Sequence, residues 1–202
     1  MAAAPNKHQQ RTEHTRRKLL DAGLRVFARD GFEAARIEDI AAASGHTRGA
    51  FYANFETKED LFLVLLEEQA VKRVGELSAV LERSKTGQGA LKALRAAYLE
   101  RANDPRWAML TLEFKLFALR HGKHAKLAAA HRRIRASMNF DAITKFLPPR
   151  LCDAKTGEAC KVMLEVALSG LVVEHAYDPK RISRRQVAIL LGQIFDMVVS
   201  PY

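Results

Sequence analysis

The 202-residue sequence predicts an all-α protein of about nine helices. Apolar residues recur at intervals of three and four along nearly the whole chain, which is the period of amphipathic helices. Gly, Pro and Asp interrupt this pattern about every twenty residues, as they do between the helices of a helical array. Almost nothing shows the alternation of a half-buried strand. The length suggests one large domain or two unequal ones.

The first sixty residues predict three helices packed together. The first runs from about 15 to 30 and ends at Gly31, where a C-terminal cap belongs. Two short helices follow at 37–44 and 48–54. Between them stands Gly45, at a turn position that needs a positive φ.

A capping box at 57–60 predicts the start of a long helix that continues to about residue 83. Proline and glycine then mark the ends of five further helices, because proline cannot continue a helix. These helices are expected at 89–102, 106–121, 124–147, 157–177 and 183–199.

The net charge of +10 suggests a nucleic-acid partner, but its distribution does not locate a site. Residues 1–60 hold ten basic and nine acidic residues. The excess lies downstream, notably in residues 120–135, which carry six basic residues and no acidic one. We interpret that segment as a solvated helix face, with an anionic effector or partner as the alternative.

Other function classes leave no trace in the sequence. The cysteines at 152 and 160 fit neither a disulfide framework nor a usual metal spacing. We expect a cytoplasmic protein, since the polar N-terminus lacks the apolar run of a signal peptide. Residues 162–173, the most apolar stretch, are too short to cross a membrane.

Catalytic and metal-binding patterns are also missing. There is no nucleophile elbow and no phosphate-binding loop. His121, His124 and His131 lack carboxylate or cysteine partners at helical spacing, so we expect no metal and no cofactor. The rival interpretations are an enzyme or carrier with an apolar cavity, and a structural protein that binds a partner.

Residues 36–55 have the build of a helix–turn–helix. The second short helix begins after Thr47, whose hydroxyl can accept a hydrogen bond from a backbone N–H of the next turn. Phe51 and Phe55 are four residues apart and are expected to face the core. The histidine at position 46 is expected to pack at the turn.

The opposite side of the second helix predicts a surface that reads DNA. Arg48 and Tyr52 share this side, and an arginine can pair with guanine O6 and N7, worth roughly 1–3 kcal/mol of discrimination. Hydroxyls and a lysine nearby are placed for phosphates. The predicted DNA-contacting residues are Thr47, Arg48, Gly49, Ala50, Tyr52, Asn54 and Lys58.

The segment RIEDIAAASGHTRGAFYANFETKEDLF (36–62), preceded by LLDAGLRVFARDGFEA (19–34), strongly resembles the N-terminal domain of the TetR family. The resemblance covers about residues 12–72. It implies a homodimeric transcriptional regulator, usually a repressor, whose C-terminal helical domain (73–202) binds a small effector. Residues 1–11 would form a flexible basic arm.

Two positions depart from the family pattern. Ala35-Arg36 stands where the family often has two threonines, so the usual hydroxyl cap is missing and Arg36 would reach a phosphate instead. Position 46 is usually apolar and here is His46.

The helix at 106–121 carries two apolar sides, which predicts that it is largely buried. Met109, Leu112, Leu116 and Leu119 line one side. The spacing of the other side favours ordinary core, whereas the resemblance places this helix beside the effector cavity. The candidate effector pocket is Trp107, Leu110, Phe114, Phe117 and Met138.

The last two helices carry apolar stripes that suggest a four-helix interface with a second copy of the chain; the alternative is a monomer core. The predicted interface residues are Leu164, Ala167, Leu168, Leu171, Val187, Leu190, Leu191, Ile194 and Val198.

Together these features predict a DNA-binding transcriptional regulator rather than an enzyme. We expect a homodimer whose recognition helices enter successive major grooves of a pseudo-palindromic operator, about 34–36 Å apart. A small, largely hydrophobic effector would release it from the DNA. The residues leave open which effector and operator are involved, and whether the protein represses or activates.

Overall fold

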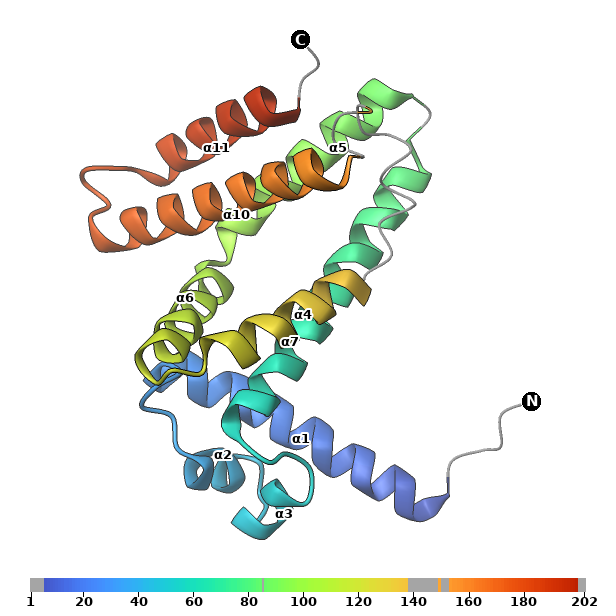
Figure 1. Ribbon diagram of the computed structural model, residues 1–202, viewed down its shortest axis with the longest axis vertical. Coiled ribbons are helices and arrows are strands. Elements are labelled where there is room, and N and C mark those ends of the chain that lie inside the picture. Colours follow the sequence, from blue (N-terminus) through green and yellow to red (C-terminus); the bar gives the residue numbers. More distant parts are fainter. Residues whose placement is uncertain (1–5, 85, 138–148, 150–152, 200–202) are drawn as a thin grey trace. The chain divides into compact units, whose positions relative to one another are not determined.

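The computed structural model describes residues 6–84, 86–137, 149 and 153–199, and this part of the chain contains helices and no strand (Figure 1). The predicted all-α class is confirmed. The helices are α1 (Lys7–Asp30), α2 (Ile37–Ala43), α3 (Arg48–Tyr52), α4 (Lys58–Glu82), α5 (Gly87–Glu100), the 3-10 turn η1 (Arg101–Asn103), α6 (Pro105–Arg120), α7 (His124–Ser137), α10 (Ala154–Tyr177) and α11 (Arg184–Val199).

The largest difference from the predicted boundaries is at the start of α1. The helix begins at Lys7 rather than near 15, so residues 7–11, predicted as part of a flexible arm, are helical. This stretch holds Lys, Gln and Arg, which are good helix formers, and no Gly or Pro. The helix predicted for 124–147 is described only to Ser137, and Met138 lies outside the described residues.

Side-chain caps determine where several helices start. One of the two bonds of the predicted capping box is present: the Thr57 hydroxyl accepts from the Asp60 N–H at 3.1 Å. A reciprocal box begins α11, where the Ser183 N–H donates to Gln186 Oε1 at 2.8 Å and the Gln186 N–H donates to Ser183 Oγ at 3.3 Å. Asp153 accepts from the Thr156 N–H at 2.8 Å, so α10 starts three residues before the predicted position.

The chain divides into two compact units. The N-terminal unit comprises residues 1–70 and 113–135, and the C-terminal unit comprises residues 71–112 and 136–202. The N-terminal unit therefore includes the end of α6 and most of α7, which the sequence assigned to the second domain.

Five phenylalanine rings form the centre of the N-terminal unit. Phe27 of α1, Phe32 of the following loop and Phe62 of α4 are fully buried. Phe114 and Phe117 of α6 close the cluster, with centroids 5.1 Å from that of Phe32. Phe114 and Phe117 therefore lie more than fifty positions after the other three rings in the sequence.

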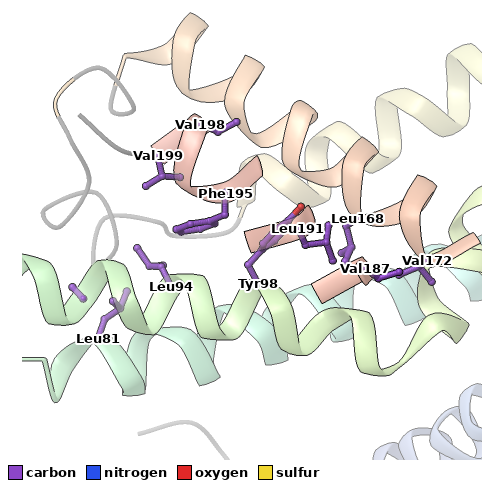
Figure 2. Packing of buried hydrophobic residues seen from close by; sticks show 11 residues of the cluster. Leu81, Leu94, Tyr98, Leu168, Val172, Val187, Leu191, Phe195, Val198 and Val199 are labelled. Carbon is purple, nitrogen blue, oxygen red and sulfur yellow. The ribbon is translucent and has the colours of Figure 1, made fainter. Parts of the chain in front are cut away.

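The C-terminal unit has its own apolar core (Figure 2). The antiparallel pair α10 and α11 contributes most of it, and α5 packs against α11. Tyr98 of α5 lies inside this core, with its ring 5.7 Å from that of Phe195. Its hydroxyl donates to the Leu164 carbonyl at 2.8 Å, which satisfies the one polar atom of the buried ring.

Candidate nucleic-acid interface

The helix–turn–helix forms as the sequence predicted. Gly45 has φ +73° at the turn between α2 and α3. The Thr47 hydroxyl accepts from the Ala50 N–H at 3.2 Å and caps α3. Phe51 and Phe55 are buried, with 0% and 4% of their surface exposed. They hold one side of α3 against the unit's core, so its other side faces outward.

Arg48 and Tyr52 occupy that outer side. Both residues are exposed, and the Arg48 Nη2 donates to the Tyr52 hydroxyl at 3.2 Å. Arg48 Nη1 lies 2.9 Å from Glu38 Oε1, an oxygen that belongs to the first turn of α2. The hydrogen bond to Tyr52, followed by the nearby charges, raises the pKa of Arg48, so the guanidinium stays cationic.

The smaller predicted residues lie around this pair. Thr47 and Gly49 are exposed and Ala50 is half-buried. Asn54 is half-buried, and its Nδ2 donates to the Ala50 carbonyl at 2.8 Å. One amide proton of Asn54 is therefore used inside the helix–turn–helix. Arg36 stands exposed at the start of α2 and makes no side-chain cap there, as its sequence predicted.

Lys58 differs from its predicted role. Its Nζ donates to the carbonyls of Phe32, Glu33 and Ala35, at 2.9, 2.7 and 3.0 Å. Three bonds use all three protons of an ammonium group. Partial burial lowers the pKa of Lys58. These contacts do not fit a phosphate ligand, because Lys58 holds together the loop that leads into α2.

Two arginines of α1 hold the C-terminal ends of α2 and α3 in place in the same way, by donating to backbone carbonyls. Arg16 Nη1 donates to the Asn54 carbonyl at 2.9 Å, and its guanidinium lies 4.3 Å from the Phe55 ring centroid. Arg25 Nη2 donates to the Ala43 carbonyl at 3.2 Å. Sequence reasoning missed both roles, because these acceptors are backbone atoms distant in the chain.

The end of α6 is tied to the loop before α2. A carboxylate oxygen of Glu113 accepts from the Phe32 N–H at 2.6 Å. Gly31 has φ +79°, and a Cβ at that position would stand 2.9 Å from the same oxygen. A side chain there would therefore meet both backbone strain and the carboxylate.

Ion pairs reinforce this connection. Arg120 Nη1 donates to Glu33 Oε2 at 3.0 Å, and His121 lies 3.3 Å from the other oxygen of that carboxylate. These contacts, led by His121, lower the pKa of Glu33. Lys123 pairs at 2.5 Å with the nearly buried Glu59. Part of the basic segment 120–135 is thus neutralised within the N-terminal unit.

The turn itself explains the position of His46. Its Nδ1 lies 2.9 Å from the Ser44 carbonyl, and Ser44 Oγ donates to the Ala41 carbonyl at 2.7 Å. The half-buried ring therefore closes the turn, as the sequence suggested. Within the described residues no three His, Cys, Asp or Glu side chains could hold a metal ion. None of the helices there is long and apolar enough to cross a membrane.

The predicted effector residues divide between the two units. Phe114 and Phe117 belong to the ring cluster of the N-terminal unit, which is the core alternative that their spacing favoured. In the C-terminal unit, Leu110 is buried and Trp107 is half-buried. A groove of about 390 Å³ lies between α10 and α11 and involves none of these four residues; it is lined by Leu171, Glu174, Arg181, Ile182, Gln186, Ile189 and Leu190.

The second side of α6 is exposed, contrary to the expectation of a largely buried helix. The exposed fractions of Met109, Leu112, Leu116 and Leu119 range from 38% to 62%. The spacing of apolar residues shows that a helix has two apolar sides. It does not show whether other elements of the fold cover both of them.

The predicted dimer residues need a similar correction. Leu168, Val187, Leu191 and Val198 are buried in the core of their own unit (Figure 2), so they do not form a free surface. Leu164, Ala167, Leu171 and Ile194 are half-buried beside this core, and Leu190 is exposed.

The free apolar surface is on the other side of the same two helices. Val166 and Met163 of α10 are 65% and 56% exposed, and Met197 and Ile189 of α11 are 67% and 48% exposed. Together with Leu190 they form what we call the outer face of α10 and α11. The predicted stripes are rotated from it by about a third of a helical turn, and Leu190 alone belongs to both sets.

Comparison with known proteins finds regulators of transcription. The family model described as "Bacterial regulatory proteins, tetR family" matches residues 19–65, which span α2, α3 and parts of α1 and α4. The chain is 26% identical over 201 residues to the HTH-type transcriptional regulator AcrR of Shigella flexneri, covering 92% of this chain and 91% of AcrR.

Two further proteins show how far the similarity extends. The chain is 31% identical over 109 residues to the uncharacterized HTH-type transcriptional regulator YwcC of Bacillus subtilis (strain 168), covering 50% of this chain and 49% of YwcC. The match thus spans about half the length of that relative. The solved structure of FadR from Bacillus subtilis in complex with stearoyl-CoA superposes with a TM-score of 0.56 at 18% identity, covering 91% of this chain and 97% of FadR.

Proposed function

Since this chain belongs to the TetR family of bacterial regulatory proteins, we propose that it is a cytoplasmic repressor that binds a pseudo-palindromic operator as a homodimer. A small, largely hydrophobic effector releases it. This is the family that the helix–turn–helix residues of the sequence resemble. Its named relatives AcrR and YwcC are HTH-type transcriptional regulators.

The outer side of α3 is the observation that carries this proposal. An exposed arginine and tyrosine stand on a short helix whose inner side is fixed by two buried phenylalanines. Gly49 between them lets the helix approach a groove closely. Ala50 is also too small to obstruct this approach. Arg48 then reads guanine, and the backbone phosphates are contacted by Thr47, Tyr52, Asn54 and Arg36.

A selection experiment tests the proposal. The wild-type chain is incubated with a pool of random-sequence duplexes, and the bound DNA is sequenced after repeated rounds. We expect enrichment of two inverted half-sites, with centres about one helical turn apart or a multiple of it. A pool that stays random, or DNA that binds without a preferred sequence, would overturn the proposal.

Dimerisation is proposed through the outer face of α10 and α11. Large exposed apolar side chains gathered on adjacent helices mark interaction sites, because they are costly to leave in water. Figure 1 shows these two helices side by side, as a helical pair that a second copy would extend to a four-helix bundle.

The effector proposal rests on the apolar character of α6 and on the contacts that its residues 113–120 make as part of the N-terminal unit. An effector that bends or shifts α6 would move Glu113 and the Phe114 ring, and with them the loop before α2. The effector must bind the DNA-free conformation more tightly, since otherwise no population shifts.

Stearoyl-CoA, which the FadR structure contains, is a suitable first ligand to test. We expect a bound hydrophobic ligand to weaken binding to the selected operator in a mobility-shift titration. Unchanged operator affinity with every ligand that demonstrably binds would contradict effector release, while leaving DNA binding intact.

A further inference from the structure

Glu38 is an acidic residue on the side of the helix–turn–helix that carries Arg48. It lies in the first turn of α2, and its Oε1 is 2.9 Å from Arg48 Nη1. Its other oxygen lies 3.9 Å from Arg36 Nε. One carboxylate therefore stands between the two arginines predicted to contact DNA.

A carboxylate at this place is unfavourable for simple attraction to DNA, because it repels phosphates. It also contributes little to folding, since ion pairs between exposed side chains are worth almost nothing to stability. Glu38 and Arg48 are both exposed, with 45% and 60% of their side-chain surface accessible. The ion pair is therefore expected to affect the orientation of the Arg48 guanidinium rather than the stability of the fold.

The contacts of Arg48 leave its base-reading fork free. Nη2 donates one proton to the Tyr52 hydroxyl, and Nη1 forms an ion pair with Glu38. A guanidinium has five N–H donors, two on each terminal nitrogen and one on Nε. The hydrogen bond to Tyr52 therefore leaves a proton on each terminal nitrogen for a bidentate pair with guanine.

We propose that Glu38 is a positioning residue that, together with Tyr52, holds the Arg48 guanidinium in the orientation for reading a base, and so determines the specificity of the operator contact. The inference rests on the proposed DNA binding. An unsupported arginine must lose the freedom of its rotamers when it binds, whereas one already held from two sides has lost it beforehand.

Glu38→Ala tests this inference, and Asp39→Ala is the matched control. Asp39 is the next residue in the same turn, is exposed and has the same charge, but the contacts of Arg48 do not involve it. The measurement is the ratio of Kd values for two duplexes. One is the operator selected by the wild-type chain, and the other differs from it at the pair whose preference Arg48→Ala abolishes.

An exposed ion pair supplies at most about 1 kcal/mol, and this limits how much of the ordering cost of Arg48 it can save, so Glu38→Ala should reduce this ratio up to about 5-fold. Asp39→Ala should leave the ratio unchanged, although both variants gain affinity for all DNA by losing a negative charge. Glu38→Gln keeps an oxygen at the same reach and should retain more of the ratio than Glu38→Ala. In an Arg48→Ala background, Glu38→Ala should have no further effect on the ratio.

Two results would overturn the inference. Equal ratios for Glu38→Ala and the wild type would make Glu38 a purely electrostatic neighbour. A loss that persists in the Arg48→Ala background would mean that Glu38 contacts DNA by itself. Neither result affects the proposed function, which fails only if the wild-type chain selects no operator.

Discussion

Arg48 is the residue whose side chain gives the most direct prediction. Arg48→Ala should remove the preference for one base pair in each half-site, because a bidentate guanine contact supplies about 1–3 kcal/mol of discrimination. Arg36→Ala should instead weaken binding to all sequences alike. The measurement is a mobility-shift titration with the selected operator and its single-pair variants. A uniform loss for Arg48→Ala would make this residue a phosphate contact.

Tyr98 predicts a pH dependence of stability. Burial raises the pKa of Tyr98 to about 12, from about 10 in an unfolded chain. The neutral phenol is the form that the fold favours, so its contribution is complete below pH 10 and is lost as the pH rises from about 10 towards 12. Tyr98→Phe should cost about 1 kcal/mol at neutral pH, for the hydrogen bond to Leu164, and should remove this alkaline loss.

Urea denaturation of both proteins at neutral pH and at about pH 11 measures this difference. Tyr177→Phe serves as the control, because Tyr177 is 86% exposed and its ring lies outside the core. A stability difference between wild type and Tyr98→Phe that stays constant with pH would contradict the assignment.

Among the elements, α10 and α11 give a prediction about assembly. Val166→Glu places a charge on the outer face, where it would be buried in a dimer, so it should shift the chain towards monomer. Val71→Glu on α4 is the matched control, at 59% exposure compared with 65% for Val166. Sedimentation velocity over a range of concentrations measures the change, and a dimer constant equal to that of the wild type would exclude this face.

Helical periodicity predicted the elements well and the partners of their faces poorly. The glycine at the turn, the Thr47 cap and the buried Phe51 follow from local spacing, and all three are present. In α10, by contrast, both sides are apolar: Leu168 is 4% exposed and Val166 is 65% exposed. Composition cannot decide which of two apolar sides meets the chain's own core. The structural roles of Lys58 and Arg16 were not predicted for another reason: their acceptors are backbone carbonyls distant in the sequence.

For the whole molecule, the two units divide the chain differently from the domains predicted at 12–72 and 73–202. Phe114 and Phe117 cover Phe32 and Phe62, and residue 113 bonds to a backbone group 81 positions away. Contacts at such separation leave no signal in local periodicity. Sequence alone therefore located the helix–turn–helix but not the second segment that completes its core.

A fragment of residues 1–72 should accordingly fail to fold cooperatively. Domains of this size are marginal, and removing one buried Phe side chain already costs about 3–5 kcal/mol. Losing two rings approaches the whole stability of a small domain. Thermal unfolding followed by circular dichroism measures this, with Phe114→Ala in the full chain as the intermediate case. A sharp transition in the fragment would show that the covering rings are dispensable.

The basic residues bound to backbone carbonyls have a consequence for how binding responds to ionic strength. Each phosphate neutralised by a protein releases counterions and contributes a slope of about −0.9 to log K against log salt. Arg16, Arg25 and Lys58 are engaged within their own chain and would release no counterions. A dimer has six such cations. The slope of log K against log salt concentration should therefore be less steep by about 5 than if all six contacted phosphates. The operator complex should therefore tolerate salt better than a net charge of +10 per chain suggests.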